Sequence, residues 1–274
     1  MREQITEPVP QLLYYQLADE VVAFSTTRHG GVSTGNYASM NINNYCGDSP
    51  SSIAENSSLL CQTLQISSSR LVYPHQIHKT ECLIIDHAFL AMTDDERRRR
   101  LEGYDAIVTS EYGVCIGVST ADCIPIIIYD PVRHVVAAVH AGWRGTVARI
   151  AEKTTAEMQK TYGSDSETFK AVIGPGISMK NFEVGWEVWQ EFANQGFPMG
   201  DISDSLECNE NGSRPHIDLP YCNELQLLEM GIRKENITQA GICTYESSDN
   251  FFSARKLGIK SGRIFTGVML RNKS

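Results

Sequence analysis

The stretch VCIGVSTADCIPIIIYDPVRHVVAAVHAGWRGT, residues 114–146, decides the fold. It contains three short runs rich in β-branched residues, at Val114–Val118, Ile124–Tyr129 and Val135–Val139. Such runs are typical of buried strands, and the Asp-Pro sequence at 130–131 is typical of a turn between the last two. A helical pattern of apolar residues begins at Thr146 and ends near Tyr162. The stretch therefore predicts neighbouring strands followed by a helix.

Further predicted strands and helices surround this centre without a steady strand–helix alternation. The other predicted strands are Val21–Thr27, Leu71–Tyr73, Glu81–Asp86, Phe169–Ile173, Ile242–Thr244 and Arg263–Met269, with one more after Asp105. The other predicted helices are Ile53–Leu64 (capped by Ser51 or Ser52), Ala88–Leu101, Trp186–Gln195 and Asp218–Met230, and residues 1–20 form a lead-in. This order favours an α+β fold with mixed sheets over a doubly wound parallel sheet. Because no repeat, linker or internal boundary interrupts the chain, we expect one domain over residues 1–274.

The composition is that of an ordinary soluble globular protein, with 42% apolar and 21% charged residues. A net charge of −9 argues against a nucleic-acid partner, which would require a basic face. The one basic run, Arg97–Arg100, follows three acidic residues in a predicted helix. Ion pairs three and four residues apart would largely compensate it, which indicates a solvated helix face.

The chain shows no secretory signal at its start and no window of about 20 apolar residues that could cross a membrane. None of its eight cysteines forms a Cys-x-x-Cys pair. We therefore expect reduced thiols and a cytoplasmic location, with no membrane partner.

Three residues, His78, Cys123 and His140, form a candidate metal site. Two imidazoles and one thiolate suit zinc, with copper as the alternative, and three protein ligands leave the open position of a catalytic site. Each residue also has a plainer interpretation, such as packing for the cysteine, and no spacing rule links the three. His75 precedes His78 by three residues, and in an extended segment the two would point to opposite faces, so we expect only one to enter the site.

The same residues permit a metal-free nucleophilic site. Cys123 could act as the nucleophile, with His140 or His78 as its base and Asp122 or Asp105 as the orienting group. Asp105 alternatively orients a ligand histidine by hydrogen bonding. The residue types alone do not separate these two arrangements.

Three arginines in loop settings are candidates for binding an anion. Arg28 lies beside a Gly-Gly turn, Arg144 lies at the start of a predicted helix whose first amides favour an anion, and Arg255 lies near the C-terminus. Asn41 belongs to an amide-rich loop and is a candidate for contacting substrate, although turn formation explains the loop more simply.

Taken together, several segments resemble one known family. They are Thr27–Ser33, Ser39–Asn41, Gln76–His78, Asp105–Ala106, Thr120–Pro125, His140–Thr146, Ile173–Ile177, Phe182–Gly185 and Gly262–Arg263, in this order. From about residue 22 to the C-terminus the chain resembles the YfiH family, also called the multicopper polyphenol oxidase or laccase-domain family. The ADC-x-P and HAGWRGT segments are highly specific in combination.

The resemblance implies layers of helix, sheet, sheet and helix, and a metal held by His78, Cys123 and His140. It also implies phosphorolysis of adenosine, inosine and S-methyl-5'-thioadenosine together with adenosine deamination, while the laccase label refers to copper-dependent oxidation of phenols. The chain departs from the family pattern at Lys79, where a small residue is usual, and in Ser253–Gly258, which precedes a one-residue insertion before Gly262.

We therefore expect a zinc-dependent purine nucleoside phosphorylase with adenosine deaminase activity, acting as a monomer or homodimer on a purine nucleoside and phosphate. Asp105 or Asp122 would move the proton in deamination, and one of the three arginines would position phosphate. The alternatives are a copper-dependent polyphenol oxidase, a metal-free cysteine hydrolase and a non-catalytic binding module. Only seven histidines are present, which disfavours a site for several coppers.

Overall fold

Two β-sheets pack face to face in the computed structural model, which describes residues 8–205 and 213–271. The first sheet has the strand order β1 (Leu12–Tyr15), β2 (Val21–Thr26), β11 (Ile264–Leu270), β6 (Cys115–Thr120) and β3 (Leu71–Val72). The second has the order β10 (Ile237–Gln239), β9 (Lys170–Ile173), β7 (Ile124–Asp130), β8 (Val135–Ala141), β5 (Ala106–Thr109) and β4 (Cys82–Ile85).

Both sheets are mixed. Strands β3 and β6 pair in parallel in the first sheet, as do β4 with β5 and β9 with β10 in the second. The other named pairs, including the long β7–β8 and β11–β6 ladders, are antiparallel. The predicted α+β class with mixed sheets is confirmed.

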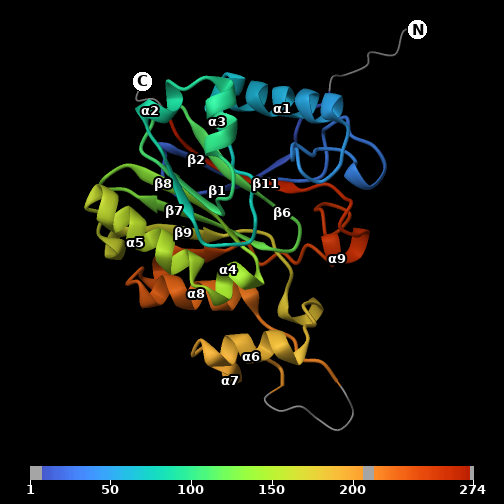
Figure 1. The fold of residues 1–274 in the computed structure, drawn as a ribbon, viewed down its shortest axis with the longest axis vertical. Helices are drawn as coiled ribbons and strands as arrows, with labels where there is room; N and C mark the ends of the chain where they lie inside the picture. The colour runs from blue at the N-terminus through green and yellow to red at the C-terminus, as the bar shows by residue number, and fades with distance from the viewer. Residues whose placement is uncertain (1–7, 206–212, 272–274) are drawn as a thin grey trace.

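Apolar side chains bury three successive interfaces, which produces four layers. Val118, Ile127 and Val136 pack between the two sheets. Helix α1 (Pro50–Leu64) places Leu60 against the outer face of the first sheet. Helices α5 (Ile150–Tyr162) and α8 (Leu219–Glu229) cover the outer face of the second sheet. Figure 1 shows α1 above the strands and α5 and α8 below them, and this shared core supports the proposal of one domain.

Two predicted helices are each divided in the structure. The predicted helix Ala88–Leu101 is α2 (His87–Leu90) and α3 (Asp94–Arg100), because Thr93 starts α3 with a capping box to Glu96. The predicted helix from Thr146 is α4 (Trp143–Val147) and α5, because Arg149 between them adopts a left-handed backbone with φ of 64°.

The other differences from the predicted elements concern short strands at the sheet edges and the start of one helix. The lead-in contains β1, and Ile242–Thr244 makes only a single bridge from Cys243 to Gly176, while the strand of this region is the earlier β10. Helix α1 begins at Pro50, after Ser49, rather than at Ile53. Residues 1–7 and Cys208 lie outside the described residues.

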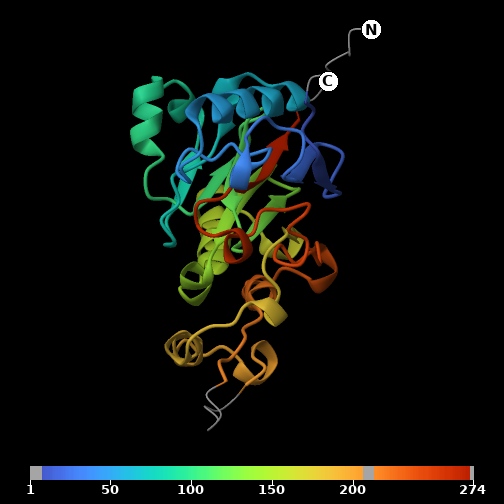
Figure 2. The same ribbon diagram turned by 90° about the vertical axis from the view of Figure 1, so that its right-hand side faces the viewer.

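The remaining helices lie beyond the sheets. They are α6 (Trp186–Asn194), α7 (Met199–Ile202) and α9 (Ala254–Leu257). Helices α6 and α7 lie farthest from the strands in both ribbon views (Figures 1 and 2). Within residues 8–205 and 213–271, no helix combines the length and apolar character required to span a membrane.

Candidate metal centre

The β7–β8 ladder brings two of the predicted ligands together. Its register pairs Ile124 with Ala141, so Cys123, just before β7, lies beside His140 near the end of β8. His78 reaches the same point from the loop between β3 and β4, where its own backbone turns with φ of 61°. The three ligand atoms all lie within 4.8 Å of one another, and Cys123 Sγ is 4.0 Å from His78 Nε2. We call these residues the triad.

Asp105 holds two members of the triad in place. Its wholly buried carboxylate accepts hydrogen bonds from the amides of Ile77 (3.2 Å), His78 (2.9 Å) and Lys79 (2.7 Å), and from His140 Nδ1 (2.8 Å). The Nδ1–H donated to Asp105 leaves Nε2 of His140 free to bind a metal. Because Lys79 contributes only its main chain to this contact, the family departure at this position leaves the arrangement intact.

Gly142, immediately before α4, leaves the space in which the triad side chains meet. A Cβ at this position would lie 2.9 Å from His78 Cδ2 and 3.1 Å from Cys123 Sγ. A side chain at this position would therefore press on two ligands. Two nitrogens, one sulfur and a wall kept clear by glycine fit a tetrahedral zinc ion with one open position.

The charges of the triad favour a thiolate. Burial would raise the pKa of Cys123, but His140 and His78 beside it lower that pKa to about 6. Burial would likewise lower the pKa of His140, but the neighbouring Cys123 and the hydrogen bond to Asp105 raise it to about 9. Burial also works against ionisation of Asp105, yet the bond to His140 and the amides hold its pKa below the ordinary value. A thiolate is the form of cysteine that binds metals and attacks electrophiles.

The triad lines a cavity of about 330 Å³, which we call the triad cavity. Ser119 and Thr120, at the end of β6, also line it, and their buried hydroxyl oxygens have no hydrogen-bond partner among the described residues. His75 lines the same cavity as His78. Only His78 of the two belongs to the metal-ligating group, so one of these histidines enters the metal site while His75 lines the cavity.

Neither predicted proton carrier lines the triad cavity. Asp105 directs its oxygens at the amides and His140, as described above. Asp122 accepts from the Thr244 hydroxyl (2.7 Å) and from the Arg255 amide (2.6 Å), which joins the segment before β7 to the start of α9. Both carboxylates therefore position other groups.

The predicted anion-binding arginines point to other places. Arg28 donates to the carbonyls of Ala38 (2.8 Å) and Ser248 (2.7 Å). Arg255 donates to the carbonyls of Asn181 and Glu183. Arg144 is exposed, lies over the ring of Trp143 and lines a separate cavity. The structure does not bring these three arginines to the triad cavity.

Arg263, which was not among the predicted site residues, does line the triad cavity. It immediately precedes β11, whose first residue Ile264 pairs with Thr120 at the end of β6. Asn41 is buried and accepts from the Arg263 amide (3.1 Å), so it holds this wall rather than lining the cavity. Only the Gly262-Arg263 motif pointed to this residue in the sequence.

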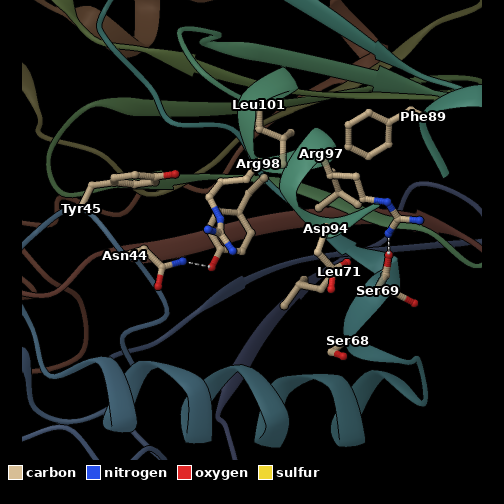
Figure 3. Close-up of a pocket in the computed structure, with 12 residues that line it drawn as sticks. Asn44, Tyr45, Ser68, Ser69, Leu71, Phe89, Asp94, Arg97, Arg98 and Leu101 are labelled. Atoms are coloured by element: carbon tan, nitrogen blue, oxygen red, sulfur yellow. Dashed lines mark hydrogen bonds between the residues drawn. The ribbon is translucent and has the colours of Figure 1, made fainter. Parts of the chain in front are cut away.

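A larger cavity of about 510 Å³, drawn in Figure 3, is lined by Asn44, Tyr45 and Leu101 among others. Tyr45 also lines the triad cavity. We call the larger cavity the arginine cavity, because Arg97 and Arg98 line it. Arg97 already donates to the carbonyls of Ser69 (2.9 Å) and Leu90, and its buried Nε has no partner among the described residues. The exposed Arg98 pairs with Asp95 at 3.6 Å.

The fold and the site together define a four-layer α+β protein with a two-histidine, one-cysteine site where the second sheet ends. The chain belongs to the family described as multi-copper polyphenol oxidoreductase laccase, whose sequence profile matches residues 22–271. The predicted resemblance to the YfiH family is thereby confirmed.

Three relatives illustrate this membership. The chain is 44% identical to a protein of Bacteroides thetaiotaomicron named purine nucleoside phosphorylase, over 97% of this chain and 98% of that one. It is 38% identical to adenosine deaminase RL5 of an unknown prokaryotic organism, over 94% and 97% of the two chains. The crystal structure of the hypothetical protein YfiH of Bacillus licheniformis superimposes with a TM-score of 0.86 at 25% identity, covering 96% of this chain and 97% of that one.

Proposed function

We propose that this protein is a zinc-dependent purine nucleoside phosphorylase that also deaminates adenosine. Its substrates would be adenosine, inosine or S-methyl-5'-thioadenosine together with phosphate, and its products a free base and a ribose 1-phosphate. The observation that supports this proposal most strongly is that the triad lines a cavity. The chain is also 44% identical over nearly its full length to a protein named purine nucleoside phosphorylase.

His78, Cys123 and His140 would hold the zinc ion. Bound there, zinc supplies a Lewis acid beside the cavity. The protein's part is to fix the ligands: Asp105 sets the tautomer of His140 and orders the His78 loop, and Gly142 keeps the shared space clear. The same donor set would accept copper, so the identity of the metal is a question for the purified protein.

Arg263 replaces the three predicted arginines as the proposed phosphate ligand. Its guanidinium is held near the triad cavity by bonds to the carbonyls of Ser261 (2.7 Å) and Ile259 (2.9 Å). A permanently charged, planar donor suits a phosphate oxygen.

The test is hypoxanthine release from inosine, with and without phosphate. We expect the wild type to release hypoxanthine only when phosphate is present. We expect Cys123→Ala to lose both this release and its bound zinc. Cys243→Ala is the matched control, because Cys243 is also half-buried but does not line the triad cavity. Absence of release from zinc-loaded wild-type protein would contradict the proposal.

A metal-free cysteine hydrolase is the second candidate, and one observation favours it. Cys123, with its lowered pKa, His140 and Asp105 form a connected nucleophile–base–carboxylate arrangement. Chelation would leave such an enzyme active and alkylation of Cys123 would inactivate it. The zinc enzyme should lose activity under chelation and recover it when zinc is returned.

Copper-dependent phenol oxidation is favoured only by the family description. A multicopper enzyme requires several metal sites, and the triad is the one group of three or more suitable side chains found among residues 8–205 and 213–271. Metal analysis of protein produced without added copper distinguishes the two enzymes, because the phosphorylase should contain zinc and should not oxidise phenols in that form.

A further inference from the structure

Phosphorolysis requires a proton carrier that the triad does not provide. When hydrogen phosphate attacks C1' of inosine, the C1'–O bond forms, the C1'–N9 bond breaks and its electron pair passes to the purine. Ribose 1-phosphate lacks the proton that hydrogen phosphate carried, and hypoxanthine gains one. Some group must therefore pass this proton from phosphate to base, and no carboxylate lies among the described residues that line the triad cavity.

His75 is placed for this transfer. Its Nδ1 lies 2.7 Å from a carboxylate oxygen of Glu102, which leaves the other ring nitrogen for a ligand. Tyr45 stacks on the ring with centroids 3.7 Å apart and planes inclined by 14°. The backbone is fixed as well, since the His75 amide donates to the Leu101 carbonyl (2.9 Å) and accepts at its own carbonyl from Gly103 (3.0 Å).

The other titratable side chains of the cavity are less suited. His78, Cys123 and His140 are ligands in the proposed function, and Arg263 does not release its proton in proteins. Burial and the nearby Glu102 raise the pKa of the Tyr45 phenol, so it holds its proton. The Cys46 thiol is hydrogen-bonded to the Asn43 carbonyl. A histidine held by a carboxylate is the usual group for general acid–base transfer near neutral pH.

We propose that His75, held by Glu102, donates the proton that the departing purine takes up, and regains a proton from the newly formed sugar phosphate after the C1'–N9 bond has broken. This assignment rests on the proposed phosphorylase function. Each turnover returns the imidazole to its starting state, so no further reactant is needed. Glu102 and Tyr45 act as positioning residues for the ring.

The test compares two nucleosides that differ only in their need for this proton. Inosine requires protonation of its leaving purine, whereas 7-methylinosine already carries a positive charge on the purine and releases a neutral base without it. In His75→Gln we expect kcat/KM for inosine to fall by roughly 100-fold, with a loss of less than about fivefold for 7-methylinosine. Glu102→Gln should give a smaller loss with the same preference, and Tyr45→Phe, which keeps the stack, should leave the ratio of the two substrates unchanged.

Zinc content and melting temperature of each variant show that the site and the fold are retained. Equal losses on both nucleosides would assign His75 a packing role and overturn the proposal, as would an unchanged kcat/KM for inosine. Wild-type protein inactive toward both nucleosides in the presence of phosphate would instead overturn the proposed function, and this assignment with it.

Discussion

The triad cavity and the arginine cavity are neighbours that share Tyr45, yet they differ in what they offer a ligand. The arginine cavity is larger, about 510 Å³ against 330 Å³, and contains two guanidinium groups. Both terminal nitrogens of Arg97 donate to backbone carbonyls, and Arg98 is exposed and forms an ion pair with Asp95. The triad cavity has three metal-ligating atoms and two buried hydroxyls without partners among the described residues. The group of three metal-ligating side chains, rather than size or charge, distinguishes the triad cavity from the arginine cavity.

The largest effect within the triad cavity is expected from Asp105→Asn. The amide cannot accept from His140 Nδ1 and from three backbone amides at once, so zinc affinity should fall by about 10–100-fold. Competition with a fluorescent chelator measures it. Asp122→Asn is the matched control, since that carboxylate is also committed to hydrogen bonds but accepts none from a triad residue. Equal zinc affinity in both variants would refute the role given to Asp105.

Asp105 also predicts a pH dependence of stability in the metal-free protein. Because the fold holds the Asp105 pKa below its ordinary value, the carboxylate stabilises the folded state above the unfolded pKa of about 4 and loses this contribution as pH falls further. The difference in unfolding free energy between wild type and Asp105→Asn should therefore narrow below that pH, as urea titrations at several pH values would reveal. A difference that stays constant would contradict the assignment.

A somewhat smaller effect is expected from Gly142→Ala. The added methyl group would press on His78 and Cys123, so one ligand must move and zinc affinity should fall about tenfold. Gly200→Ala is the control, because a Cβ at Gly200 meets nothing within 4 Å. Isothermal titration of zinc into the two metal-free variants compares them, and unchanged affinity in Gly142→Ala would show that the ligands can separate without cost.

Arginine substitutions on the two sides of Tyr45 compare the cavities directly. Arg263→Ala should raise the KM for phosphate by about tenfold, which corresponds to one lost charge-assisted hydrogen bond. Arg98→Ala, on the arginine cavity, should leave this KM unchanged. Initial rates at varied phosphate and saturating inosine measure both, and the reverse order of effects would move the phosphate site to the arginine cavity.

The smallest effect is expected from Arg97→Ala, and it concerns stability alone. Arg97 joins α3 to the carbonyls of Ser69 and Leu90, so its removal should lower the unfolding free energy by about 1–2 kcal/mol. Removal of the exposed Arg98–Asp95 pair should change it by less than about 1 kcal/mol. Chemical denaturation measures both. Loss of phosphorolysis in Arg97→Ala without loss of stability would give the arginine cavity a functional role.

The long central strands were predictable because their β-branched runs are typical of buried strands, whereas the two-sheet layering was implied only by the family resemblance. Breaks in helices that are caused by tertiary contacts were not predictable. Arg149 divides α4 from α5 although no glycine or proline marks the position. Its side chain pairs with Glu229 and lies over Phe197, and these distant contacts outweigh the local preference for a continued helix. Strands such as β1 and β10 span only four and three residues, too few for a periodic pattern.

The triad was predictable from residue chemistry, since two histidines and a cysteine next to buried strands suggest a metal. The arginines were not, because all of them offer the same chemistry and only the packing separates them. Arg263 reaches the cavity through the pairing of β11 with β6, and the His75 backbone is held there by hydrogen bonds with Leu101 and Gly103. Both depend on contacts between segments far apart in the chain.

The position of β11 has a consequence for how the protein is made. This last strand lies in the interior of the first sheet, between β2 and β6, whereas β4–β5 and β7–β9 of the second sheet come from one stretch of chain, residues 82–173. On the ribosome, the ligand-bearing strands can pair long before the first sheet can close. Until β11 emerges, the edges of β2 and β6 that pair with it lack their partner strand, so this is the interval in which a chaperone would be most useful.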